Sequence, residues 1–190
     1  MARTRVQTLT EAKALAAVAN PFRSRMLDAL RVDGPSTASA LAQRTGQAVG
    51  SVSHHLKVLA EANLVEEAPE LARDRRERWW RLSAPSRRWS RSEFADDRPA
   101  VAAALAAENL QLARQFERAQ VWQDNHEAEG EWVDAAFATQ AWLRLAPDEL
   151  GALGREVLAL IERWSEREVP ADGRDREPIL FFARAFPAQP

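Results

Sequence analysis

The stretch Gly50–Glu67, with the sequence GSVSHHLKVLAEANLVEE, constrains the fold more than any other part of the chain. At about 100° per residue, its large apolar side chains fall on one side of a helix, namely Val52, Leu56 and Leu59. The other side carries polar groups, namely Ser53, His54 and Lys57. Asn63 can adopt the left-handed conformation in which a helix stops abruptly. The pattern therefore predicts a helix over about 48–62, with one buried and one polar face, that leads directly into a strand.

Three shorter helices are expected before this one. Thr8 or Thr10 can cap the first, which runs to about 18, and Pro21 suits the first position of the second. Ser36 or Thr37 can cap the third, which ends before Gly46. After the helix over 48–62, two short strands at 64–68 and 78–82 enclose the charged loop 69–77. A tight turn followed by a helix with a polar outer face is the helix-turn-helix arrangement, and two strands after it would form a wing.

The polar face of the helix over 48–62 suits DNA, because protruding N–H groups and the helix dipole favour an anion at its start. Residues 73–91 add eight arginines against Asp74 and Glu77. A wing over 69–78 would bring some of these arginines to the phosphate backbone. The DNA-contact residues expected from this reasoning are Gln47, Ser51, Ser53, His54 and Lys57 on the helix and Arg73, Arg75 and Arg76 on the wing.

The residues QAVGSVSHHLKVLAEANLV, at 47–65, resemble the recognition helix of ArsR-type winged-helix transcriptional regulators. The resemblance extends back to NPFRSRMLDAL and ALAQRTG and forward to RDRRERWWRL, so that it covers roughly 10–85. It implies a winged helix-turn-helix fold and DNA binding. Asn63 stands where the family usually has glycine. Members that sense metals use cysteines in the third helix, and this chain has none, so metal sensing does not carry over.

The two halves of the chain differ in charge. Residues 1–98 hold 17 basic against 12 acidic residues, and residues 99–190 hold 9 against 16. We predict a DNA-binding domain over 1–85, a linker over 86–98 and a helical domain over 99–190. In the helical domain, Pro99 opens a long helix to about 126, a second helix covers 148–168, and strands are expected over 137–145 and 178–187. The overall class is mainly α with small β, with an α+β C-terminal domain for dimerisation and effector binding.

Two features of the C-terminal half suggest roles. The long helix carries an apolar stripe at near-heptad spacing that suits a partner helix, formed by Leu105, Leu112, Phe116 and Ala119. Aromatic residues at helical spacing are usually core, but a chamber for an apolar or aromatic effector is the alternative. Its lining would be Trp122, Trp132, Phe137, Trp142, Phe181 and Phe182.

Several classes of function find no support in the sequence. No nucleotide-binding loop, nucleophile elbow or metal-ligand spacing is present, so neither an enzyme, a cofactor nor a metal site is expected. Adjacent His54 and His55 point about 100° apart and cannot share an ion without help. The longest apolar run, Ala100–Ala107, is far shorter than the ~20 residues of a membrane span. No signal peptide is apparent, so a cytoplasmic location is expected.

The sequence thus predicts a bacterial-type DNA-binding transcriptional regulator, more typical of a repressor than of an activator. It would act as a homodimer on double-stranded DNA with a pseudo-palindromic operator. Two alternatives are left open: a winged helix used only for protein contacts, and an enzyme with an unrecognised site.

Overall fold

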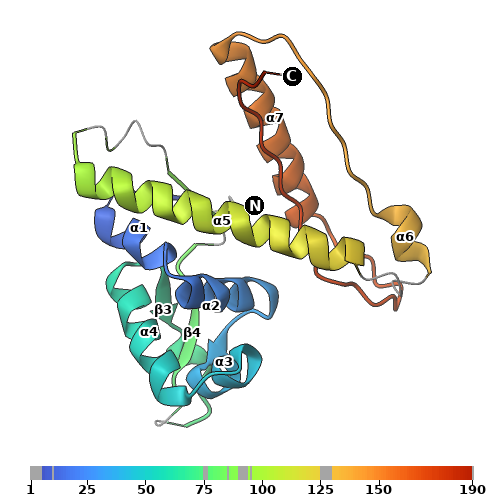
Figure 1. Ribbon diagram of the computed structural model, residues 1–190. Helices are drawn as coiled ribbons and strands as arrows, with labels where there is room; N and C mark the ends of the chain where they lie inside the picture. The colour runs from blue at the N-terminus through green and yellow to red at the C-terminus, as the bar shows by residue number, and fades with distance from the viewer. Residues whose placement is uncertain are drawn as a thin grey trace. The chain divides into compact units, whose positions relative to one another are not determined.

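The computed structural model describes residues 6–9, 11–74, 77–84, 86–89, 94, 96–124 and 130–189 of the 190-residue chain. The chain divides into two compact units, Met1–Arg114 and Gln115–Pro190. Each unit is described by itself below (Figure 1).

The helices of the first unit begin and end where local chemistry predicts. Helix α1 covers Ala12–Val18, α2 covers Pro21–Val32, α3 covers Ala38–Thr45 and α4 covers Val49–Glu61. The side chain of Asn20 caps α2, and that of Thr37 caps α3. Helix α1 has no side-chain cap; Thr8 lies in a strand before it, and Thr10 is outside the described residues. The predicted helix over 48–62 is therefore confirmed as α4.

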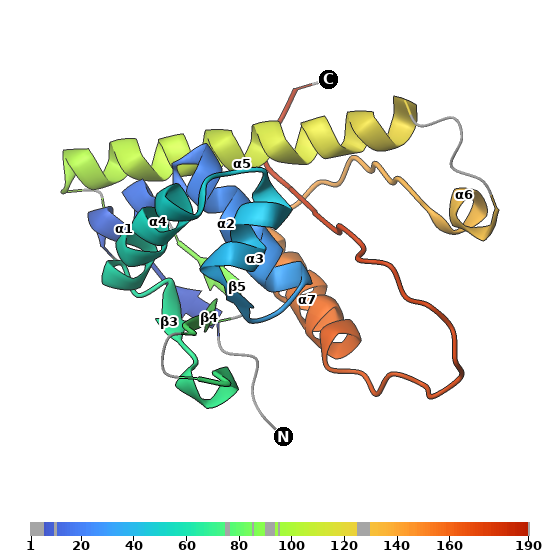
Figure 2. The ribbon, with the colours of Figure 1, turned by 90° about the horizontal axis from the view of Figure 1, so that it is seen from below.

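Two small sheets accompany these helices. Strands β3 (Val65–Glu67) and β4 (Trp79–Leu82) pair antiparallel, with β2 (Ser36–Thr37) on the other edge of β4. This sheet contains the expected wing, formed by β3 and β4 (Figure 2). The third strand, β2, was not indicated by the sequence. Strand β1 (Val6–Thr8) pairs parallel with β5 (Ser86–Arg88), and this pair was not predicted either. A short 3-10 helix, Pro69–Leu71, begins the loop between β3 and β4.

The core of the first unit is built by apolar faces of all four helices. Leu15, Met26, Leu41 and Leu56 are at most 1% exposed. Trp80 is buried and Trp79 is half-buried, as expected for neighbouring residues of a strand. No polar or charged side chain of the described residues is buried. The mainly α winged-helix class predicted for this part of the chain is confirmed.

The long helix α5, Arg98–Asp124, begins inside the first unit. Its Ala100 and Ala104 belong to the same hydrophobic core, together with Phe94 from the segment before it. Arg114 donates to Ser24 Oγ, and its Nη2 lies 2.9 Å from Asp28 Oδ2 of α2. The first half of α5 lies across α1 and α2 (Figures 1 and 2). The two compact units consequently divide at Arg114 and not at the linker expected over 86–98. The reason is that the expected linker and the start of α5 supply residues to the core of the first unit.

The second unit contains the end of α5, the short helix α6 (Glu131–Ala135) and the amphipathic helix α7 (Pro147–Ser165). Ala146 precedes α7 without a side-chain cap, while the Glu149 carboxylate accepts from the Ala146 N–H at 2.7 Å. The strands predicted over 137–145 and 178–187 are wrong, since both segments lack regular structure. Alternating side chains do not suffice for a strand, whose backbone groups need a neighbouring strand as partner.

Candidate DNA-binding surface

The turn between α3 and α4 sets the direction of the candidate recognition helix. Gly46 has φ 66°, a left-handed conformation that costs glycine little. The Gln47 N–H donates to Ala42 O at 2.9 Å and closes the end of α3. Ala48 then precedes α4 and offers no side-chain cap. The first N–H groups of α4 thus lack a side-chain acceptor, and such groups favour an anion.

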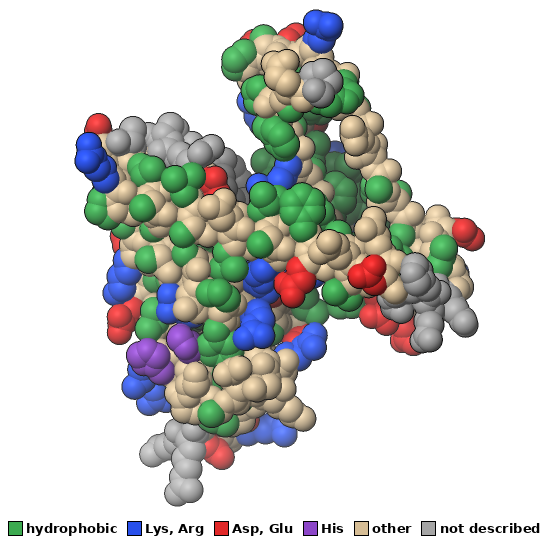
Figure 3. All heavy atoms as spheres, in the orientation of Figure 1, with side chains coloured by type: hydrophobic (Ala, Val, Ile, Leu, Met, Phe, Trp, Pro, Cys, Tyr) green, Lys and Arg blue, Asp and Glu red, His purple; other side chains and the backbone are tan. Residues whose placement is uncertain are grey.

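Helix α4 divides into the two faces that its sequence predicts. Val52, Leu56 and Leu59 are fully buried. His54 and Lys57 are exposed, and Ser53 is half-buried. The helix ends at Glu61, and Asn63, two residues later, has φ 54°. The Asn63 carbonyl accepts a hydrogen bond from Gln7 Nε2 at 3.0 Å, which links the N-terminal segment to the end of this helix. Figure 3 shows the two described histidines together on the molecular surface.

The structure brings most of the expected contact residues to one region. Gln47 is exposed at the turn before α4, Ser51 is half-buried in its first turn, and Arg73 is exposed in the loop between β3 and β4. Arg75 and Arg76 lie outside the described residues. A groove of about 400 Å³ connects α4 to the wing and is lined by Thr37, Ala38, Ser39, Ser53, Glu77 and Arg78. The predicted set contained only Ser53 of these.

His55 is half-buried, and its buried Nδ1 has no hydrogen-bond partner. Its ring packs edge-on against Phe22, with centroids 4.8 Å apart, and stands 5.3 Å from the ring of His54. Burial lowers the pKa of His55 below its usual value, and the nearby charge of Arg23 and His54 lowers it further. The described residues contain no group of three or more metal-ligating side chains.

The wing neutralises part of its own positive charge. Arg81 Nε lies 2.7 Å from Glu66 Oε1, and the same guanidinium also contacts Glu70. Both carboxylates raise the pKa of Arg81, Glu66 first. Arg78 lies 3.5 Å from Glu67. Two described arginines of the wing, Arg78 and Arg81, are therefore paired with acidic residues of the same wing.

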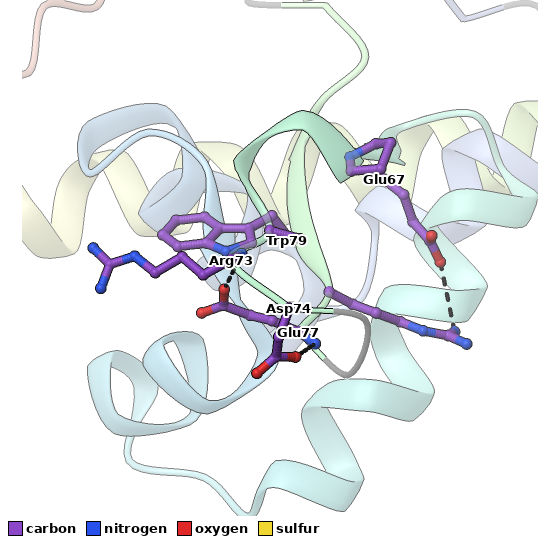
Figure 4. Close-up of a pocket in the computed structure, with 8 residues that line it drawn as sticks. Glu67, Arg73, Asp74, Glu77 and Trp79 are labelled. Atoms are coloured by element: carbon purple, nitrogen blue, oxygen red, sulfur yellow. Dashed lines mark hydrogen bonds and ion pairs between the residues drawn. The ribbon is translucent and has the colours of Figure 1, made fainter.

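The loop of the wing is held by its acidic residues (Figure 4). The Arg73 N–H donates to Glu77 Oε2 at 2.9 Å, and the Glu77 N–H donates to Asp74 Oδ1 at 3.0 Å. The hydrogen bond from the Arg73 N–H lowers the pKa of Glu77. These groups line a second depression of about 460 Å³. Sequence reasoning missed this structural role, although Asp74 and Glu77 stood out among the arginines.

The six residues expected around an effector lie in the second unit. Each side chain is exposed in the single chain, from 37% for Phe182 to 78% for Phe137. The other four are Trp122, Trp132, Trp142 and Phe181, at 45%, 38%, 62% and 45%. At such exposure these six residues do not enclose a chamber within one chain. Their role as an effector site stays a prediction.

Comparison with known proteins gives one match to a family. Residues 18–68 match a family model described as a helix-turn-helix domain, which bears out the helix-turn-helix resemblance for this part of the chain. A search of curated proteins found no match. Among the described residues, no helix has the length and apolarity needed to cross a membrane.

Among the solved structures with weak similarity to this chain are the following three. One is the homodimeric winged helix-turn-helix DNA-binding domain of Mb0332 from Mycobacterium bovis, a possible ArsR-family transcriptional regulator. It has 22% sequence identity and a TM-score of 0.35, and the match covers 60% of this chain and 84% of that chain. RV1404 from Mycobacterium tuberculosis has 18% identity and TM-score 0.32, with 87% and 86% covered. A C30AH42A mutant of ZitR from Lactococcus lactis in its apo form has 16% identity and TM-score 0.32, with 76% and 81% covered. The family match itself supports DNA-binding transcriptional regulation as the class of function.

Proposed function

We propose that this chain, with its helix-turn-helix domain over 18–68 and its resemblance to ArsR-type regulators, is a sequence-specific DNA-binding repressor. It acts as a homodimer on a pseudo-palindromic operator in the cytoplasm of a bacterium. The observation that carries the proposal is the exposed polar face of α4, which begins at an uncapped N-terminus and adjoins a groove to the wing. A helix of this kind fits the major groove of DNA.

The contacts divide into reading and positioning. Ser53, His54 and Lys57 read base edges, with Gln47 and Ser51 at the start of the helix. The recognition face has no arginine, so it lacks the bidentate contact to guanine that is the commonest specific contact. Sequence-dependent DNA shape then contributes more to specificity. Arg73, with Arg75 and Arg76, contacts phosphates without reading the sequence.

The chain has two lysines, which offer a matched pair of variants. Lys57 is exposed on α4, whereas Lys13 on α1 pairs with Glu61 at 3.2 Å. Lys57→Ala should weaken binding to the operator by ~1–3 kcal/mol. Lys13→Ala removes the same charge away from the recognition face and should leave operator affinity nearly unchanged. Arg73→Ala should weaken binding to every duplex alike and reduce the salt slope by ~1.

The assay is fluorescence anisotropy with a labelled operator and a scrambled duplex over a range of salt concentrations. If the unmutated protein binds no duplex at low salt, the proposal fails and a winged helix for protein contacts replaces it. If Lys13→Ala and Lys57→Ala weaken binding equally, α4 does not read the DNA.

An apolar or aromatic effector is the second part of the proposal. The aromatic residues of the second unit support it, since few charges or histidines converge there to hold a metal or a phosphate. A ligand would act by preferring one arrangement of the two recognition helices over another. The test is quenching of tryptophan fluorescence by a compound that also releases the operator.

A further inference from the structure

The second unit exposes nearly all of its apolar side chains. Residues 115–189 contain 22 Val, Ile, Leu, Phe and Trp residues, of which nineteen are exposed and three are half-buried. No described residue of this unit is buried. Figure 3 shows the hydrophobic side chains of this unit on its surface. The first unit, by contrast, buries most of its large apolar side chains in one core.

The accessible surface shows how much area is left uncovered. The chain exposes 14559 Å² for a mass of 21.3 kDa. Two separate globules with the masses of the two units would together expose about 11,000 Å². The excess of roughly 3,500 Å² belongs to the chain as a whole, and the comparison already treats the two units as separate globules. A standard transient interface covers only about 800 Å² on each partner.

Helix α7 shows that this exposure is an unfilled interface and not a polar surface. Five of its large apolar residues form one stripe, which consists of Leu150, Leu153, Val157, Ile161 and Trp164. The first three are half-buried, while Ile161 is 37% and Trp164 60% exposed. An amphipathic helix of this kind is stable only when its apolar face is covered.

We infer that the C-terminal unit acquires its core only against the same unit of a second copy of this chain, so that folding of this unit and dimerisation are one step. A drug-sized ligand cannot cover an area of this size, and an interface of several thousand Å² is typical of obligate dimers. The exposed apolar surface is continuous along the chain with Leu105 and Phe116 of α5, which are 38% and 57% exposed. This inference rests on the proposed homodimer and assigns it a second, larger interface.

The net charge of the second unit predicts that dimerisation and DNA binding respond to salt in opposite directions. Residues 115–190 hold 15 acidic and 8 basic residues, a net charge of −7. Two such units repel each other at low salt, and salt screens this repulsion. Dimerisation through this unit therefore strengthens as salt rises, whereas DNA binding weakens.

The test uses full-length protein in sedimentation velocity and hydrogen exchange. Trp164→Glu should shift the dimer to a monomer and abolish protection of the amides in Pro147–Ser165, while Val49–Glu61 stay protected. Val32→Glu is the matched control, because Val32 is 49% exposed on α2 of the first unit; it should remain dimeric. The unmutated protein, diluted to monomer, should lose protection in α7 in the same way.

Three results would overturn the inference. These are a dimeric Trp164→Glu with protected α7, a dilute monomer whose α7 stays protected, and an unmutated protein that is monomeric with unprotected α7 at every concentration. The last result would mean that a different protein covers this unit. The proposed function fails separately, if an intact dimer with protected α7 binds no duplex.

Discussion

Glu67→Gln is the substitution that best tests whether the wing meets DNA. Glu67 ends β3, and its carboxylate lies 3.5 Å from Arg78 Nη1. The two side chains are 49% and 71% exposed. Such exposed pairs contribute only ~0–1 kcal/mol to stability, so the variant should fold normally. The substitution removes one negative charge beside the groove and leaves Arg78 without this partner.

The size of the effect follows from Coulomb's law. A unit charge about 8 Å from a phosphate contributes roughly 0.5 kcal/mol in water. Neutralising Glu67 removes this repulsion and makes Arg78 available to a phosphate, which contributes a similar amount. We therefore expect DNA binding to tighten by about 2- to 6-fold at low salt. The slope of log affinity against log salt should steepen by up to ~0.9 if Arg78 gains a phosphate contact.

Glu61→Gln is the matched control. It changes the net charge equally but lies at the last turn of α4, where Glu61 pairs with Lys13. Anisotropy titrations with operator and scrambled duplex between about 50 and 200 mM salt measure both variants. The reasoning is refuted if the two variants shift affinity by the same factor, or if Glu67→Gln weakens binding.

Three further predictions concern stability and assembly. Since burial lowers the pKa of His55, the His55 side chain binds a proton more readily in the unfolded chain than in the folded one. The free energy of unfolding should therefore be level above the usual pKa of ~6.5 and fall as the pH drops below it. Urea titrations at two pH values measure this fall, which His55→Gln should lessen. Arg114→Met should cost ~1–3 kcal/mol in urea unfolding, because Arg114 is only 12% exposed and its loss removes the charge-assisted contacts to Asp28 and Ser24. A cost near zero would show that α5 is not tied to α2. Phe116→Glu places a charge on the apolar stripe of α5 and should yield monomers with reduced operator affinity in sedimentation and anisotropy; a dimer with full affinity would contradict the α5 interface.

The helix-turn-helix part of the fold was predictable because its signals are local. Asn20 and Thr37 accept the hydrogen bonds expected of helix caps, and Gly46 and Asn63 have the positive φ expected of helix ends. The buried and polar sides of α4 follow from a 3.6-residue period. Each of these features depends on residues within a few positions of one another, and the sequence displays them directly.

The wing was predicted in outline but not in its electrostatics. An excess of arginine in 73–91 indicated a phosphate-binding loop. The spacing along the chain could not show that Arg81 meets Glu66 and Glu70, which are 15 and 11 residues away. Strand pairing brings these charges together, so only the register of β3 on β4 reveals that part of the positive charge is neutralised.

The C-terminal half shows why alternation misled the prediction of strands. Residues 137–145 have the period of a strand, but a strand forms only where a neighbour satisfies its backbone. Sequence also placed a linker over 86–98, where polar residues predominate. The structure instead uses Phe94 in the core and ties Arg114 to α2, contacts between residues far apart in the chain.

By itself, the sequence determined the four helices before the wing, their ends apart from the start of α1, and the two faces of α4, because capping, turn chemistry and helical period act between near neighbours. The tertiary structure decided the short strands β1, β2 and β5, the ion pairs of the wing and the extension of the first unit to Arg114. It also revealed that residues 115–189 have apolar faces without a core. These features arise from contacts between segments that are far apart in the sequence. Such contacts exist only in the folded chain, and no sequence period or local motif indicates them.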